Sequence, residues 1–392
     1  MPLVPLLRNA FDPVPRLAEL RDRTGVVGFD IPGGPHTRLL TRYADVRAVL
    51  HDTTRFGNDF TAIAGTRIGV AAGLWRPNGL GFRDPPEHTR LRRLIAPEFS
   101  HQSLMRLRPR VQELADRHLD RLAAAGSPAE LLADFAAPFT AHVICELLGI
   151  PPDERADLRH VAGDRFRFSG HVASSLTAVT QSRAKVHGLI SRRRAHPGDG
   201  LIGRLIREHG DALDDHELAG LADGLLTGGH DSASSVITLG TLLLLQRPEH
   251  AALVRDSATD APLGPIVEEI LRYLSVAQLA FPRFARAATT VCGQPVEAGA
   301  MVLCSLPAAN RDPALGADLE VFDPTREVLP HVAFGHGVHH CVGAPLARLQ
   351  MRVAYRSLLR RFPRLRPAVP MHDIEFRNPS IIYGAATVPV EW

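Results

Sequence analysis

Hydrophobic residues recur with a helical period through the middle of the chain, whereas strand-like stretches are confined to its two ends. Near the N-terminus, the pattern predicts short helices over residues 14–23 and 43–51 and a strand over residues 37–41. From Arg92 to Gly149 the pattern is helical throughout. The run Gly149-Ile150-Pro151-Pro152 predicts that this helical stretch ends there, because glycine and proline stop helices.

Helical periodicity continues over residues 153–196, broken at Gly170 and at Pro197. A long helix is then predicted from Asp214 to the stop at Pro248, and Glu217 three residues after Asp214 makes a start resembling a capping box. The later elements are, in order, a helix over Leu263–Leu274, strand-like pieces through Leu303, an ordered loop over 310–332, a helix over Pro345–Arg361 and short closing β pieces.

No repeat or linker divides the chain, so one large mainly-α domain with a small β-rich lobe is expected. Composition is that of a globular protein, with 45% hydrophobic and 22% charged residues, and a formal charge of +3 is too small to indicate nucleic acid as a partner. No signal peptide is recognised in residues 1–15, and the longest apolar run, 236–245, is too short to span a bilayer. Four cysteines without a CxxC pair fit a reducing cytoplasm, so a soluble cytoplasmic protein without a membrane partner is expected.

The segment from Phe334 to Gly343, FGHGVHHCVG, carries the clearest candidate chemistry. Its glycines let the backbone turn tightly and approach a flat ligand, and a helix beginning at Pro345 follows Cys341 directly. The positive end of that helix should lower the pKa of the Cys341 thiol and favour a metal-ligating thiolate.

This segment resembles the haem-binding signature of the cytochrome P450 family, in which a Phe, two Gly, a basic residue, the Cys and a following Gly recur at the same spacing. The resemblance implies a single P450 domain over residues 1–392, with haem b between the long central helix and the helix after the cysteine. It implies that Cys341 ligates the iron, that Phe334, Gly335 and Gly343 shape the loop, and that His339 reaches a propionate. Two other readings of the cysteine are a small buried hydrophobe and, with the nearby histidines, a zinc ligand.

Within the long helix, Gly228 and Gly229 precede His230, Asp231 and Ser232. Two adjacent glycines cost a helix about 1 kcal/mol each relative to alanine, so a ligand lying against the backbone would account for them. The stretch is similar to the oxygen-activating segment of the same family, with Asp231 at the acid position and Ser232 at the alcohol position. A carboxylate and a hydroxyl can deliver the protons that dioxygen cleavage consumes. The family usually has threonine where this chain has Ser232, and a serine hydroxyl is freer to rotate.

Two more groups of charged residues match the family. Glu269 and Arg272 form its ExxR pattern, whose third member would be Arg326; this triad is assigned a structural role only. His88 and Arg92 lie four residues apart on one predicted helical face. Together with Arg283 they resemble the family's propionate-binding residues, since arginine grips carboxylates bidentately.

The predicted reaction is insertion of one oxygen atom from O2 into a hydrophobic small molecule, by analogy a bacterial natural product. Alternatives are oxidative coupling without oxygen insertion, or a haem-binding sensor without turnover. Electrons would come from NAD(P)H through separate redox proteins, with a ferredoxin-type partner docking near four arginines spaced every four residues; a solvated helix face is the other reading of that stripe. These arginines are Arg348, Arg352, Arg356 and Arg360. Candidate substrate-pocket residues are Phe60, Ile63, Trp75, Phe166, Phe168, Leu225, Leu279, Ile382 and Tyr383.

Overall fold

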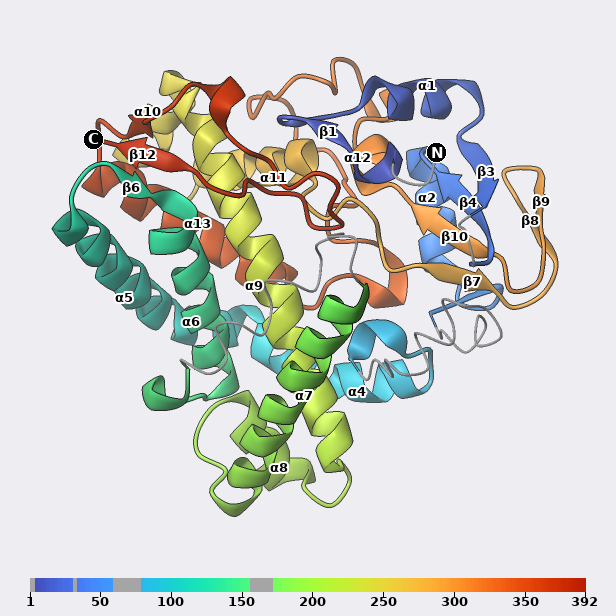
Figure 1. The fold of residues 1–392 in the computed structure, drawn as a ribbon, viewed down its shortest axis with the longest axis horizontal. Coiled ribbons are helices and arrows are strands. Elements are labelled where there is room, and N and C mark those ends of the chain that lie inside the picture. Colours follow the sequence, from blue (N-terminus) through green and yellow to red (C-terminus); the bar gives the residue numbers. More distant parts are fainter. Residues whose placement is uncertain (1–3, 31–33, 59–78, 156–171) are drawn as a thin grey trace.

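A computed structural model describes residues 4–30, 34–58, 79–155 and 172–392, with side chains from residue 184 onward in the last range. Helices make up most of the molecule, and the long helix α9 (Asp215–Leu245) runs through its middle (Figure 1). The other helices are α1 (Pro15–Arg23), α2 (Tyr43–His51), α4 (Glu87–Ile95), α5 (His101–Ala125), α6 (Ala137–Leu148), α7 (Val172–Ala195), α8 (Leu201–His209), α10 (Pro248–Asp256), α11 (Leu263–Leu274), α12 (Leu306–Ala309) and α13 (Ala344–Arg361).

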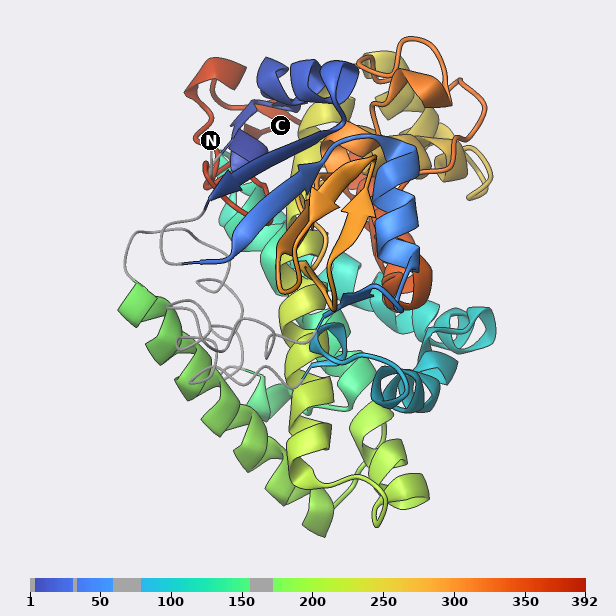
Figure 2. The same cartoon turned by 90° about the vertical axis from the view of Figure 1, so that its right-hand side faces the viewer.

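The strands are short, and all of them except β6 lie before residue 58 or after residue 282. They are β1 (Arg8–Asn9), β2 (Asp12–Pro13), β3 (Val26–Asp30), β4 (His36–Leu40), β5 (Phe56–Gly57), β6 (Ala129–Glu130), β7 (Arg283–Ala285), β8 (Thr289–Val291), β9 (Gln294–Val296), β10 (Met301–Cys304), β11 (Arg366–Pro367) and β12 (Pro389–Glu391). The largest sheet has the order β3-β4-β10-β7-β5, and only its β4–β10 pair is parallel. Figure 2 shows this sheet standing beside α9.

Local signals in the sequence placed most helices correctly. The Asp214 side chain accepts a hydrogen bond from the backbone N–H of Glu217 (2.7 Å), which confirms the predicted start of α9. Gly149 ends α6 in the left-handed conformation at φ 78°, and its N–H bonds back to the last helical turn. Short local hydrogen bonds of this kind depend only on neighbouring residues, so they can be read from sequence.

The helical pattern from Arg92 to Gly149 is divided among three helices, α4, α5 and α6. The helix containing Arg92 begins at Glu87 and ends at Ile95. A second break follows α5, where Gly126 at φ 87° leads into strand β6 and a π-helical turn, Leu131–Ala136. The hydrophobic period survives both breaks because all three helices face the same core, and periodicity alone does not reveal such breaks.

One helical window, Leu131–Leu148, is long and apolar enough to cross a membrane by length and composition alone. In the fold, 56% of this window is buried, as in the core helix of a soluble protein, and α6 packs closely against α9.

Candidate functional site

The cysteine loop is held in a defined turn directly before α13. The backbone N–H of Cys341 donates to the Phe334 carbonyl (2.9 Å), so the loop closes on itself across seven residues. Gly335 and Gly337 adopt φ 72° and 73°, in the region that favours glycine. A Cβ on Gly337 would also lie 2.6 Å from the Leu50 carbonyl oxygen at the end of α2, so this position has room only for glycine.

Cys341 is exposed to solvent. Desolvation by the surrounding loop raises the pKa of its thiol, and this effect outweighs the lowering by the N–H groups of Gly343 and Ala344 and by the positive charge of Arg92. The predicted lowering of the pKa by the helix start is thus present, but it does not decide the direction of the shift in the protein alone. The N–H groups still point at the sulfur, and a cation bound there would favour the thiolate.

Histidine and arginine side chains from three elements converge beside this loop. The rings of His88 on α4 and His339 in the cysteine loop have centroids 4.1 Å apart. Burial, together with the positive charge of Arg92, lowers the pKa of His88 to about 4. Burial and the charges of Arg283, His88 and Arg92 lower that of His339 to about 3. The structure thus brings together all four residues predicted to bind propionates.

The buried nitrogens of this cluster have no hydrogen-bond partner in the described part of the chain. They are Nδ1 and Nε2 of His88 and Nε2 of His339. Unpaired buried polar atoms are costly, and positive charge from Arg92 and Arg283 acts on the same space. An anionic group with several acceptor oxygens, such as the carboxylates of haem, could accept a hydrogen bond from the protonated nitrogen of each ring and would balance the charge of the two arginines. The residues present therefore fit the cofactor that the sequence implied.

On α9, the two glycines face different surroundings. A Cβ at Gly228 would meet no described atom within 4 Å, and Gly228 is exposed. A Cβ at Gly229 would instead lie 2.6 Å from Ile144 Cδ1, the end of a flexible side chain on α6. The space beside Gly228 suits a flat ligand, whereas Gly229 faces α6.

Asp231 and Ser232 have separate partners. The Ser232 hydroxyl donates to the Gly228 carbonyl (2.7 Å), a back-bond to the preceding helical turn. Asp231 is buried and forms an ion pair with Arg377 (2.8 Å), a residue near the C-terminus. Sequence reasoning missed Arg377, because nothing in its local sequence links it to a helix 146 residues earlier.

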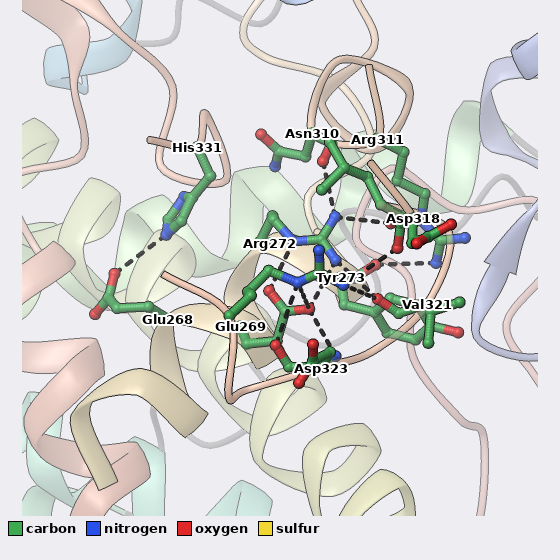
Figure 3. Close-up of polar contacts among 12 residues, drawn as sticks. Glu268, Glu269, Arg272, Tyr273, Asn310, Arg311, Asp318, Val321, Asp323 and His331 are labelled. Carbon is green, nitrogen blue, oxygen red and sulfur yellow. Dashed lines mark hydrogen bonds and ion pairs between the residues drawn. The ribbon is translucent and has the colours of Figure 1, made fainter. Parts of the chain in front are cut away.

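The predicted ExxR triad forms as expected, and Figure 3 shows its Glu269 and Arg272 side chains side by side. Arg272 and Glu269, only 1% and 5% exposed, pair through two contacts of 2.7 and 2.8 Å, and Arg326 approaches Glu269 at 3.3 Å. Arg272 also donates to the carbonyls of Asn310 and Leu319 (2.9 Å each). The side-chain oxygen of that same Asn310 accepts from the Val332 N–H (2.7 Å), which ties the triad to the start of the cysteine loop.

Glu268, next to the triad, is a second anchor that sequence reasoning did not find. It accepts two hydrogen bonds from Arg348 on α13 (2.6 and 2.7 Å) and one from His331 before the cysteine loop (3.2 Å). Burial tends to raise the pKa of Glu268, but these hydrogen bonds lower it to about 2. Arg348 also lies 4.7 Å over the Phe334 ring, so α11, α13 and the loop are joined here.

Three of the four arginines in the predicted basic stripe have partners within the chain. Arg348 binds Glu268, Arg356 binds Asp260, and Arg360 donates to the carbonyls of Arg255 and Ser257 (2.8 and 2.7 Å). The stripe is thus largely an attachment surface for α10, α11 and their connection. This use differs from both readings of the sequence.

Of the predicted pocket residues, Phe60, Ile63, Trp75, Phe166 and Phe168 lie outside the described residues. Leu225 on α9 is half-buried, and Leu279 and Ile382 form isolated β-bridges with Ser305 and Ala277. Tyr383 is fully buried, and its hydroxyl donates to the Ala10 carbonyl (2.6 Å). Its core position accounts for this tyrosine without a ligand.

Comparison with known proteins gives matches in the family that the sequence resembles. A family model described as cytochrome P450 matches residues 263–387. The chain is 39% identical to cytochrome P450 FAS1 of Rhodococcoides fascians, over 98% of this chain and 97% of that protein. It is 38% identical to mycinamicin IV hydroxylase/epoxidase of Micromonospora griseorubida, over 96% and 95%.

Solved structures agree over nearly the whole chain. P450 StaH from glycopeptide antibiotic biosynthesis has a TM-score of 0.86 at 41% identity, covering 99% of both chains. OxyC, implicated in an oxidative C–C coupling reaction during vancomycin biosynthesis, has a TM-score of 0.85 at 36% identity, covering 99% of this chain and 96% of that one. The predicted fold class and the family resemblance are both confirmed, and the chain belongs to the cytochrome P450 family of haem-dependent monooxygenases.

Proposed function

We propose that the Cys341 thiolate is the axial ligand of a haem b iron and that the chain inserts one oxygen atom from O2 into a hydrophobic substrate. The observation that carries this proposal is the tight loop that presents the sulfur to the N–H groups of Gly343 and Ala344 at the start of α13. When bound, a thiolate-ligated haem supplies the oxidising chemistry, because the sulfur donates electron density that favours O–O cleavage. A haem-binding sensor would need no buried carboxylate beside the glycines of α9.

His88, Arg92, Arg283 and His339 are proposed to hold the haem propionates, with Phe334, Gly335 and Gly343 shaping the loop on the thiolate side and Gly228 bordering the opposite face. The unpaired nitrogens of His88 and His339 support this assignment. These residues orient the group and balance its charge.

Substituting Arg92 with leucine should speed transfer of haem from the protein to apomyoglobin by about tenfold or more, because a charge-assisted carboxylate contact is lost. Arg93 is the matched control, since it lies on the same helix and is exposed. The Arg93→Leu protein should transfer haem at the wild-type rate. Equal rates in the Arg92 and Arg93 variants would argue against the propionate assignment.

Ser232 and Asp231 are proposed to handle the protons. With its own hydrogen donated to Gly228, the Ser232 oxygen is oriented as an acceptor, so it can hold a water or a donor group of the substrate. Delivering its own proton requires rotation of the side chain, which serine allows more freely than threonine. Asp231 is the group that gains and loses a proton.

In a Ser232→Ala variant, we expect NADPH oxidation to be diverted largely into hydrogen peroxide, with product yield per NADPH falling about a hundredfold, the lower end of the range expected for a lost proton-transfer group. Peroxide and product are measured together against NADPH consumed. The control is Ser232→Thr, which restores the family's usual residue and should keep the yield at or above wild type. An unchanged yield in the alanine variant would show that the hydroxyl is dispensable.

Natural-product tailoring is proposed as the biological role, in line with the names of the mycinamicin enzyme and StaH. Oxidative coupling is the second candidate, because OxyC is similar over almost the whole chain. Reaction under 18O-labelled dioxygen separates the two. Insertion places one labelled atom in the product, whereas coupling leaves the product unlabelled and two hydrogens lighter.

Electrons are proposed to come from NAD(P)H through a ferredoxin-type partner in the cytoplasm. Because Arg348 and Arg356 are already ion-paired, a partner docking on α13 would find less free positive charge than the sequence suggests. Residues 1–392 are proposed to act as a single domain.

A further inference from the structure

A hairpin near the C-terminus, residues 376–385, contacts α9 through Arg377. Arg377 Nη1 donates to Asp231 Oδ1 (2.8 Å), and Nη2 donates to the hydroxyl of Ser235, one turn further along the helix. Both charged side chains are nearly buried, with 10% exposure for Arg377 and 9% for Asp231. The second carboxylate oxygen, Asp231 Oδ2, is buried and has no hydrogen-bond partner among the residues that the structure describes.

The hairpin is shaped to hold this guanidinium. The backbone N–H of Arg377 donates to the Gly384 carbonyl (2.9 Å), and Phe376 and Ala385 form a β-bridge beside it. A Cβ on Gly384 would overlap the Arg377 guanidinium and lie 2.7 Å from the Ser235 hydroxyl. Glycine at position 384 is therefore what lets the arginine lie flat between the hairpin and α9.

The N-terminal segment fastens the next residue of the same hairpin. The Arg8 N–H donates to the Asn378 side-chain oxygen (3.2 Å), and the Asn378 amide donates to the Arg8 carbonyl (2.8 Å). Arg377 is thus placed by two regions of chain that lie far from α9 in the sequence. Such support on both sides restricts the positions that its side chain can occupy.

We propose that Arg377 is the positioning residue for Asp231: it fixes the carboxylate through Oδ1 and leaves Oδ2 as the oxygen at which a proton is gained and lost. This inference rests on the proposed relay role of Asp231. A proton accepted at Oδ2 leaves from the same oxygen, so the carboxylate returns to its starting form in each cycle. Arg377 keeps its charge throughout, because a guanidinium does not deprotonate in proteins.

The alternative is that Arg377 only fastens the hairpin to α9. Removing one partner of a buried ion pair destabilises a protein strongly, so stability alone does not separate the two roles. The rate of dioxygen consumption per haem, compared in H2O and D2O, does separate them. The ratio of the rates in H2O and D2O increases only when proton delivery becomes slower.

The experiment compares Arg377→Gln, Asp231→Asn, their double variant, Arg377→Lys, Gly384→Ala and the control Arg366→Gln. Arg366 is an exposed arginine of the same C-terminal lobe, paired with Glu391 (2.8 Å). Each protein is loaded with haem and given NADPH, a surrogate ferredoxin and its reductase, and no organic substrate. Urea unfolding of the haem-free proteins provides the readout that does not depend on activity.

We expect Arg377→Gln to slow dioxygen consumption about tenfold and to raise the solvent isotope effect, as Asp231→Asn does. The double variant should be no more than about twofold slower than either single variant, because the residues act as a unit. Arg377→Lys should recover part of the rate. Gly384→Ala, which displaces the guanidinium without removing it, should reproduce the defect. In urea, Arg377→Gln and Asp231→Asn should each raise the unfolding constant by about a hundredfold, and the double variant by no more.

A normal rate and isotope effect per haem in Arg377→Gln, with a defective Asp231→Asn, would overturn the inference and leave the relay standing. The inference would also be overturned if the rate of dioxygen consumption in the double variant fell by the product of the two single decreases. If Asp231→Asn itself has a normal rate and isotope effect, the proposed relay is wrong and the role of Arg377 falls with it.

Discussion

A Cys341→Ser protein should fold and yet lose the thiolate-type spectrum, and its NADPH-supported turnover should fall to background. Serine keeps the size and the loop hydrogen bond from the Cys341 N–H to the Phe334 carbonyl, so the change removes the sulfur alone. A hydroxyl donates far less electron density than a thiolate, so cleavage of the O–O bond is no longer favoured to the same extent. The change is measured from the absorption spectrum of the purified protein and from the rate of NADPH oxidation after the part that forms hydrogen peroxide is subtracted.

Cys292→Ser is the matched control for that experiment. Cys292 is exposed like Cys341, but it lies in the turn between β8 and β9 on the sheet side of the molecule. Its serine variant should keep the wild-type spectrum and turnover. A Cys341→Ser protein that does the same would exclude this sulfur as the ligand.

The second large effect is expected at Arg272. Replacing it with methionine removes the closer of the two arginine partners of the buried Glu269 carboxylate, leaving Arg326 at 3.3 Å, and also removes donors to the Asn310 and Leu319 carbonyls. Removing one partner of a buried ion pair typically costs about 3–5 kcal/mol, so the free energy of unfolding should fall by about that amount. Because Asn310 also binds the Val332 N–H, haem retention should fall in the same variant.

Urea unfolding of the haem-free protein measures this change. The control is Arg366→Met, which breaks the ion pair with Glu391 at the surface, where both side chains are more than one-third exposed. Exposed pairs contribute about 0–1 kcal/mol, so this variant should unfold close to wild type. An Arg272→Met protein as stable as the control would show that the buried triad is not a stabilising anchor.

The sequence predicted what local chemistry decides. The start of α9 at Asp214, the end of α6 at Gly149 and the turn around Cys341 all depend on residues within a few positions of one another. Motif spacing likewise indicated the Glu269–Arg272–Arg326 triad and the convergence of His88 with His339, because a recognised family pattern carries distant contacts with it.

What the sequence could not predict depends on tertiary placement. Arg377 meets Asp231, and Glu268 meets Arg348, only because the fold brings distant segments together. The direction of the pKa shift of Cys341 was not predictable for a related reason: the helix start acts locally, but desolvation by the surrounding loop has the larger effect. Gly229 faces Ile144 on α6, a contact between helices that no motif in the sequence indicates.

The central claim is that the sulfur of Cys341 binds a haem iron. The most direct measurement is the absorption spectrum of the reduced, haem-containing protein after addition of carbon monoxide. Ligation by Cys341 should give a Soret band at the red-shifted position typical of a thiolate-bound haem iron. A band at the position typical of histidine ligation, or a purified protein that takes up no haem, would contradict it.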